Sequence, residues 1–245
     1  MADVAPILAT KGLKRYFGGL KAVDGVDFSL DEGEIRAIIG PNGAGKTTFV
    51  SLLSGRTSAT EGRITFRGND VTTTPAFQRV RLGIAYTFQI TNIYQKLSVI
   101  ENVRIAALGR AQREKGFRLD IEAEARSALD AVGILDRANA VAGEMAYGHQ
   151  RLLEVAMGLA LHPSLLILDE PTQGLSDSEI SGFCGLVKAI SKTATILLIE
   201  HNMDVVMRLA DRITVLNRGR ILAEGRPTEI SANAEVQAAY LGTGS

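Results

Sequence analysis

Short, continuously apolar runs alternate with longer amphipathic stretches in the second half of the chain. The runs are rich in Leu, Ile and Val and cover Leu165–Leu168, Thr195–Ile199 and Ile213–Leu216. Apolar runs without polar alternation are typical of strands buried on both faces of a parallel sheet. Helical spacing of apolar residues appears between and after these runs, near Ser178–Ser191 and over Met203–Ala210. We therefore expect strands and helices to alternate here, as in an α/β core.

The first part of the chain has a different pattern, in which apolar and polar residues alternate loosely. This pattern marks Ile7–Leu13, Val26–Leu30 and Gly62–Gly68, and it predicts short strands of an antiparallel β layer. Ile84–Phe88 is a further candidate strand, which ends at Gln89.

A helical pattern that begins at Ser98 fills the middle of the chain, and a later helix runs up to Pro163. We expect one domain that spans residues 1–245. Within it, a helical subdomain of residues 91–155 is inserted between core segments 1–90 and 156–245.

Composition narrows the function classes. Apolar residues make up 46% of the 245 residues, which is ample for a packed core. The 27 basic and 27 acidic residues give zero formal charge, so we expect no bulk electrostatic binding to nucleic acid or anionic lipid. The one cysteine, Cys184, excludes an intrachain disulfide, and its apolar neighbours predict a packed thiol.

The amino-terminal segment Met1–Pro6 lacks a basic region followed by a long apolar stretch, so we do not expect a secretory signal. A membrane-spanning helix needs about 18 or more apolar residues in a row, and the chain has no such run. Any membrane role is therefore expected to be peripheral.

A glycine-rich motif joins the apolar run Glu34–Ile39 to the helical pattern Phe49–Leu53. Strand, glycine-rich turn and helix is the context in which this spacing cradles phosphates with backbone N–H groups and a helix N-terminus. Lys46 is placed to reach the outer phosphates, and the Thr47 hydroxyl to ligate Mg²⁺. The predicted nucleotide-binding residues are Gly40, Pro41, Asn42, Gly43, Ala44, Gly45, Lys46, Thr47 and Thr48.

Two carboxylates end the predicted strand that begins at Leu165. A buried strand presents such groups beside the phosphates at its carboxyl-terminal edge. We expect Asp169 to hold Mg²⁺ and Glu170 to polarise the attacking water, a general-base role that typically contributes about 10²–10⁴-fold.

Together, Gly40–Thr48, Gln89, Leu165–Glu170 and His201 resemble the nucleotide-binding subunit of an ABC transporter, in the order typical of that family. The expected fold is therefore α/β, a P-loop NTPase (RecA-like) core with a parallel sheet, an N-terminal antiparallel β layer and an inserted helical subdomain. The resemblance implies an ATPase that releases ADP and phosphate, with ATP and Mg²⁺ as its cofactors.

The resemblance also assigns three further residues. It implies that Gln89 touches Mg²⁺ and water and leads toward a membrane subunit, and that His201 contacts the γ-phosphate and orients the water. It further implies that an aromatic residue stacks on adenine. Phe17 aligns best, with Tyr16 beside it, and core packing is the rival interpretation for both.

Two segments depart from the family pattern. The family signature Leu-Ser-Gly-Gly-Gln corresponds to Ala146–Gln150, which keeps Gly148 and Gln150 but has Tyr147 and His149. The resemblance implies that Tyr147, Gly148 and Gln150 bind ATP in trans, across a dimer. After Glu170, the chain reads Gly174-Leu175-Ser176-Asp177 where the family usually has Gly-Leu-Asp-Pro, and we expect Asp177 to cap the following helix.

Within the family, several short matches are similar to ATP-binding subunits of branched-chain amino acid importers. They are Tyr147–Gln150, Thr87–Gln89, Ile199–Met203 and Ala239–Gly242. Relatives that import urea, amides or aromatic acids share these matches. The alternatives are an ATPase of lipopolysaccharide export, a soluble ATPase of iron–sulfur cluster assembly, and a module that senses nucleotide without hydrolysis.

The resemblance implies a peripheral position at the cytoplasmic face of the inner membrane. The implied partners are a second ABC ATPase, identical or not, integral membrane permeases and, indirectly, a solute-binding protein; no nucleic acid is expected. We expect the permeases to dock near Ile90–Val99. Four residues there form either an apolar docking surface or part of the core, namely Ile90, Ile93, Tyr94 and Leu97.

Overall fold

The computed structural model describes residues 5–87, 92–111 and 120–241. The loosely alternating segments of the first part form the predicted antiparallel β layer, with strand order β2-β1-β4-β5. Its strands are β1 (Leu8–Phe17), β2 (Leu20–Leu30), β4 (Glu61–Phe66) and β5 (Asn69–Asp70).

A second sheet has the strand order β10-β9-β3-β8-β7-β6 and forms the centre of the molecule. Its strands are β3 (Ile35–Ile39), β6 (Ile84–Tyr86), β7 (Leu165–Asp169), β8 (Thr195–Ile199), β9 (Arg212–Asn217) and β10 (Arg220–Gly225). Every residue of β3, β7 and β8 is buried, which explains why these segments are apolar without alternation.

The sheet is mixed, because β10 runs antiparallel to β9 whereas the other neighbours are parallel. The sequence analysis did not predict β10. Arg218 and Gly219 both have positive φ angles, 49° and 77°, and this conformation is typical of a tight two-residue hairpin turn.

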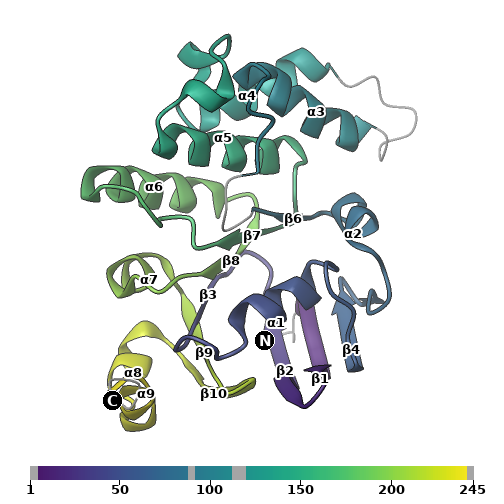
Figure 1. The fold of residues 1–245 in the computed structure, drawn as a ribbon, viewed down its shortest axis with the longest axis vertical. Coiled ribbons are helices and arrows are strands. Elements are labelled where there is room, and N and C mark those ends of the chain that lie inside the picture. Colours follow the sequence, from purple (N-terminus) through teal and green to yellow (C-terminus); the bar gives the residue numbers. More distant parts are fainter. Residues whose placement is uncertain (1–4, 88–91, 112–119, 242–245) are drawn as a thin grey trace.

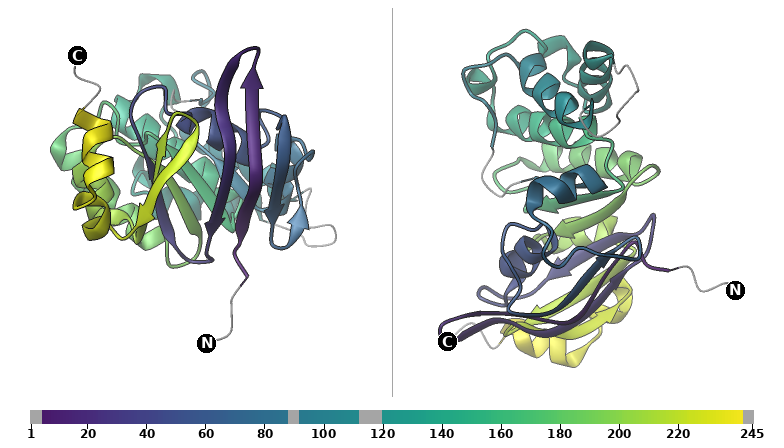
Figure 2. Two further views of the ribbon diagram at one scale, coloured as in Figure 1. Left: turned by 90° about the horizontal axis from the view of Figure 1, so that it is seen from below. Right: turned by 90° about the vertical axis from the view of Figure 1, so that its right-hand side faces the viewer.

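Three helices and two short 3₁₀ turns form the predicted helical subdomain between β6 and β7. They are α3 (Val99–Ala111), α4 (Ile121–Ala131), η1 (Leu135–Arg137), η2 (Ala142–Glu144) and α5 (Tyr147–Ala160). These helices lie at one end of the molecule and the antiparallel sheet lies toward the other (Figures 1 and 2). The division at residue 155 falls inside α5, which runs unbroken toward β7.

The remaining helices flank the sheets, and their apolar faces close the core. They are α1 (Lys46–Leu53), α2 (Ala76–Leu82), α6 (Asp177–Ile190), α7 (Met203–Leu209), α8 (Pro227–Ser231) and α9 (Ala234–Leu241). One buried cluster joins the helical subdomain to the sheet, because Val103, Leu129 and Leu153 belong to the same cluster as Leu166 and Phe183. The helical subdomain therefore shares a core with the sheet.

Helix α1 is enclosed between the antiparallel layer and the central sheet (Figure 1). Phe49 is fully buried, and its ring meets that of Phe28 from β2 edge-on, with 5.5 Å between the ring centroids. At the other end of the helix, the buried Arg79 guanidinium donates to the carbonyl oxygens of Leu52 (2.6 Å) and Leu53 (2.8 Å). The helix that follows the phosphate loop is thus held along its side and at its carboxyl end.

In the three described segments, no helix combines the length and the apolar character needed to cross a membrane.

Candidate nucleotide site

The predicted phosphate loop connects β3 to α1, and its glycines are sterically required. A Cβ on Gly40 would lie 2.1 Å from the carbonyl oxygen of Leu216, and one on Gly45 would lie 2.2 Å from that of Ala22. Gly45 also has a φ of 99°, a left-handed conformation that favours glycine. The loop therefore packs closely against two neighbouring backbones, which leaves no room for side chains at these two positions.

Lys46 folds back over this loop. Its Nζ donates to the carbonyl oxygens of Gly40 (2.6 Å) and Pro41 (3.1 Å). Partial burial lowers the pKa of the Lys46 ammonium, whereas the carboxylates of Glu170 and Asp169 raise it. The ammonium is thus close enough to both carboxylates to be influenced by their charge.

A cavity of about 600 Å³ opens over the loop and has the size of a small-molecule site. Asn42–Thr48 form one wall, and Glu170 contributes a carboxylate from the end of β7. Leu20–Ala22 at the start of β2 and Arg218 in the β9–β10 turn complete the lining. The sequence analysis did not assign these last residues, which lie far from the motif along the chain.

Asp169 is 2% exposed and accepts a hydrogen bond from the Tyr86 hydroxyl. Burial raises the pKa of the Asp169 carboxyl, while the bond from Tyr86 acts in the opposite direction by stabilising the charged form. Burial also raises the pKa of Tyr86, so its hydroxyl remains a donor. The sequence analysis missed Tyr86, although its place at the end of a strand adjacent to β7 would have indicated proximity to Asp169.

Glu170 follows Asp169 and has a φ of 46°, an uncommon value for a residue with a side chain. Its N–H donates to the carbonyl oxygen of Ile199 at 2.9 Å, which links the turn after β7 to the end of β8. The Nδ1 atom of His201 lies 3.9 Å from Oε1 of Glu170, and the imidazole is 61% exposed. The fold thus brings together the two predicted catalytic residues, 31 positions apart in the sequence.

The predicted trans segment forms the first turn of α5, and it does not line the cavity over the phosphate loop. Tyr147 is 42% exposed, and a Cβ on Gly174 would lie 3.0 Å from its ring. A Cβ on Gly148 would lie 2.2 Å from Oε1 of Glu179 in α6. The Gln150 side chain turns back and donates to the carbonyl oxygen of Met145 at 2.8 Å. This segment therefore packs against the start of α6 in its own chain.

The predicted N-cap of α6 is wrong by one residue. Ser176, not Asp177, is the N-cap, and it forms a capping box with Glu179. The carboxylate of Glu179 accepts from the Ser176 backbone N–H (2.8 Å) and hydroxyl (2.6 Å), which a cap residue without a hydroxyl cannot fully reproduce. The Ser176 departure from the family pattern thus has a structural role at this helix end.

The predicted adenine-stacking residue, Phe17, is not among the residues that line the cavity, although its strand partner is. Phe17 is 46% exposed and pairs across the β1–β2 turn with Leu20, which lines the cavity. The guanidinium of Arg15 lies 4.4 Å from the centroid of the Phe17 ring. The hydroxyl of Tyr16 donates to Oδ1 of Asp24 at 2.6 Å, and Tyr16 does not line the cavity. Gln89 and its predicted roles lie outside the described residues.

A Mg²⁺ site at Thr47 and Asp169 fits the chemistry of its ligands, since hydroxyl and carboxylate oxygens suit this hard cation. Among the described residues, no group of three or more His, Cys, Asp or Glu side chains forms a metal cage. Mg²⁺ commonly binds through one or two protein oxygens together with phosphates and water, and a site with few protein ligands agrees with that mode.

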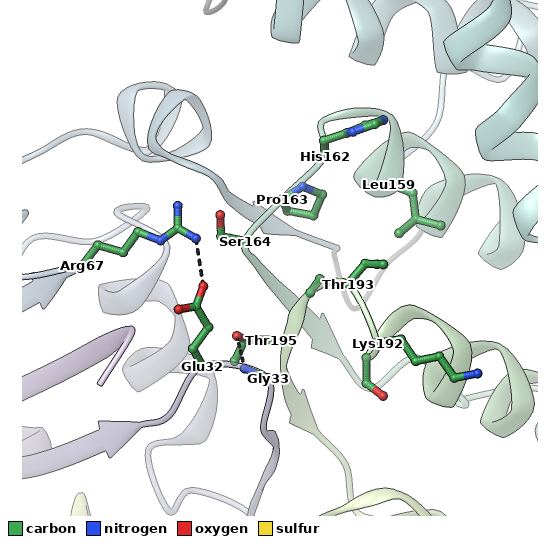
Figure 3. A pocket seen from close by; sticks show the side chains of 12 residues that line it. Glu32, Gly33, Arg67, Leu159, His162, Pro163, Ser164, Lys192, Thr193 and Thr195 are labelled. Atoms are coloured by element: carbon green, nitrogen blue, oxygen red, sulfur yellow. Dashed lines mark hydrogen bonds and ion pairs between the residues drawn. The ribbon is translucent and has the colours of Figure 1, made fainter. Parts of the chain in front are cut away.

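A second cavity, of about 500 Å³, lies at the opposite edge of the central sheet (Figure 3). Its lining includes Ser164 and Thr195, at the amino-terminal ends of β7 and β8. Arg67 and Glu32 form an ion pair there, with 3.0 Å between Nη2 and Oε1. Ligands of open α/β sheets bind at the carboxyl-terminal edge, so we assign the nucleotide to the cavity over the phosphate loop.

The phosphate loop between β3 and α1 and the carboxylate pair at the end of β7 define a P-loop nucleotide hydrolase. The sequence model of the ABC transporter family matches residues 23–173. A second family model, the branched-chain amino acid ATP-binding cassette transporter, matches residues 220–245. The chain belongs to the ABC transporter family, as an ATP-hydrolysing subunit.

Individual relatives match over nearly the full length. The chain is 41% identical to the high-affinity branched-chain amino acid transport ATP-binding protein LivG of Salmonella typhimurium, over 97% of this chain and 98% of that protein. It is 38% identical to BraF of Pseudomonas aeruginosa, a protein of the same description, over 97% and 98%. Among solved structures, it superimposes on the ADP conformation of an ATP-binding cassette of an ABC transporter with a TM-score of 0.86 and 29% identity, over 97% and 99%.

Proposed function

We propose that this chain is the ATP-hydrolysing motor of an importer of branched-chain amino acids. The observation that carries the proposal is the cavity in which the phosphate loop, Lys46 and Glu170 meet, in a chain whose full-length relatives are named for this transport. The same relatives favour an importer over lipopolysaccharide export and iron–sulfur cluster assembly.

In this proposal, the backbone of Gly40–Thr48 cradles the phosphates of ATP and the Lys46 ammonium exchanges its two carbonyl partners for the outer phosphates. Glu170 accepts a proton from the attacking water as the water approaches the γ-phosphate. His201, 3.9 Å from Glu170, contacts the γ-phosphate and orients that water. Thr47 and Asp169 would hold Mg²⁺, which would supply positive charge to the phosphate oxygens.

A second copy of an ABC ATPase completes the site. The segment Tyr147–Gln150 does not line the cavity of its own chain. The N-cap residue of α5, Ala146, has no polar side chain, and its carbonyl oxygen accepts from the N–H groups of His149 (2.9 Å) and Gln150 (3.1 Å). In this proposal, the N–H groups of Tyr147 and Gly148 at the start of the helix meet the anion. We infer that this helix end meets the γ-phosphate bound by the partner subunit, with Tyr147, Gly148 and Gln150 at the contact.

Integral membrane permeases are the other proposed partners, with a solute-binding protein acting through them. Near the expected docking segment, Tyr94 is 52% exposed, while Ile93 packs against the core cluster. Ile90 lies outside the described residues. Helices α2 and α3 add exposed apolar side chains for such a contact, namely Phe77 and Leu82 on α2 and Leu108 on α3. We propose a peripheral position at the cytoplasmic face of the inner membrane, where the permeases would be reached.

Uptake of labelled leucine tests the proposed cargo. Cells that lack the chain are complemented with the wild type, with Lys46→Ala, or with Lys192→Ala, a surface lysine away from the phosphate loop. We expect the wild type and Lys192→Ala to restore uptake of leucine, isoleucine and valine, and Lys46→Ala to leave it at the level of the deletion. Unchanged leucine uptake in the deletion strain, with loss of uptake of urea or an aromatic acid, would contradict this cargo.

A further inference from the structure

A buried carboxylate bridges the two loops that carry the proposed catalytic residues. Glu200 follows β8 directly and is 1% exposed. Its Oε1 accepts from the backbone N–H of Thr172 (3.1 Å) and from the Thr172 hydroxyl. Its Oε2 accepts from the backbone N–H groups of His201 (3.0 Å) and Asn202 (3.2 Å).

The four donors explain how a carboxylate is tolerated at this depth, because a buried charge is costly unless it is hydrogen-bonded. They also come from two different segments. Thr172 lies two residues after Glu170, in the loop that follows β7, whereas His201 and Asn202 follow β8. One side chain therefore fixes the backbone on both sides of the gap between Glu170 and His201.

Helix capping does not account for these contacts. Helix α7 is capped by the Asn202 side chain, whose Oδ1 accepts from the N–H groups of Asp204 (3.1 Å) and Val205 (3.3 Å). Helix α6, after the first loop, has its own capping box of Ser176 and Glu179. Both helix ends are thus satisfied without Glu200, whose bonds are made to the loops themselves.

We propose that Glu200 is a positioning residue for ATP hydrolysis, which acts with Thr172 to set the separation and orientation of Glu170 and His201. The proposal rests on the catalytic roles given to these two residues in the proposed function. Glu200 itself does not line the cavity over the phosphate loop, so its effect is on the rate of hydrolysis and not on the affinity for ATP.

Thr172 offers a matched pair of variants. Thr172→Val keeps the shape of the side chain and removes the hydroxyl donor, whereas Thr172→Ser keeps the donor. We expect Thr172→Val to lower kcat about tenfold, since small misplacements of reacting groups carry large rate costs, with an unchanged Kd for ATP. Thr172→Ser is expected to stay within about twofold of the wild type in kcat. Equal kcat for Thr172→Val and the wild type would overturn the proposal, as would a loss confined to ATP affinity.

A double-mutant cycle distinguishes positioning from general destabilisation. The single-turnover rate is measured with protein in excess over labelled ATP for Thr172→Val, His201→Ala and the double variant. If the bridge acts by placing His201 against Glu170, Thr172→Val has little further effect once the imidazole is gone. A full, independent loss in the His201→Ala background would overturn the proposal. Glu200→Gln is a second variant of the bridge, because the amide NH₂ of glutamine would face one of the two pairs of donors that the carboxylate now accepts from. The thermal midpoint of Glu200→Gln shows whether this variant folds. If it does not fold, Thr172→Val alone tests the proposal.

Glu170→Gln distinguishes a failure of the proposed catalytic role of Glu170 from a failure of the proposed positioning role of Glu200. If Glu170→Gln hydrolyses ATP at the wild-type rate, the proposed catalytic role fails. If Glu170→Gln is inactive and Thr172→Val is fully active, that role stands and the positioning proposal alone fails.

Discussion

Tyr86 shows how one residue can adjust the chemistry of the site without lining its cavity. Its hydroxyl donates to Asp169, whose pKa burial would otherwise raise further. The Asp169 carboxylate has to be charged to hold Mg²⁺. Tyr86 therefore extends toward acidic pH the range in which the proposed metal ligand is available.

Tyr86→Phe tests this interpretation. Removal of the hydroxyl takes away a bond to the charged form, so the pKa of Asp169 rises and the carboxyl becomes protonated at a higher pH. We expect the acidic limb of the pH–rate profile to move to higher pH, with about fivefold slower hydrolysis near pH 6 and near-normal rates near pH 8. Tyr94→Phe, which alters an exposed ring, is the control. An identical acidic limb in Tyr86→Phe and the wild type would contradict the role of this hydroxyl.

Among single residues, the sequence predicts those that belong to a short motif with a fixed spacing. The glycines and Lys46 fall in one motif, and Gly43, Gly45 and Lys46 line one cavity. Tyr86, Thr172 and Glu200 were missed because their partners lie far away in the sequence, and such pairings depend on the strand order of the sheet. Their roles emerge only when the strand ends are seen side by side.

Among the elements, α6 and α5 form the contact that links the two departures from the family pattern. Ser176 starts α6 with a capping box, and its partner Glu179 lies against Gly148 at the start of α5. The Tyr147 ring packs on Gly174 in the loop before α6. Tyr147 and Ser176 therefore belong to one packed junction between the helical subdomain and the core.

Ser176→Ala tests the capping box. Loss of an N-cap hydroxyl typically costs about 1 kcal/mol, which corresponds to a decrease of roughly 2–4 °C in Tm for a protein of this size. Ser191→Ala, at the carboxyl end of the same helix, is the matched control and is expected to change Tm by less than about 1 °C. Calorimetry or circular dichroism measures both, and equal Tm values for the two variants would show that the capping box does not stabilise the fold.

Element types were predictable where periodicity is strong, as in the buried runs of β7 and β8 and the helices of the middle segment. The exact start of α6 was not, because Ser176 and Asp177 are both good N-cap residues and the reach of Glu179 decides between them. The last strand, β10, was missed because five of its six residues are only partly buried or exposed, which weakens its pattern.

In the whole molecule, the two halves of the proposed site lie on different parts of the fold. The phosphate loop is rooted in a core enclosed by the two sheets, whereas Tyr147–Gln150 belongs to the helical subdomain. The shared buried cluster joins these parts within one chain, yet the segment stays out of its own cavity. We therefore infer that each chain supplies half of an ATP site to a partner.

A mixture of two inactive variants tests whether the ATP site is shared between two chains. Lys46→Ala removes the phosphate contact of a chain, and Gly148→Asp places a negative charge at the start of α5. In a symmetric dimer formed from both variants, one site combines the intact phosphate loop of one chain with the intact α5 end of the other.

The measurement is the ATPase rate of the two variants co-expressed, compared with each variant alone and with the wild type at equal protein concentration. We predict near-zero activity for each variant alone and about one quarter of the wild-type rate for the mixture, because half of the dimers carry one intact site of two. Full activity of Gly148→Asp alone, or a mixture no more active than its components, would contradict the shared site.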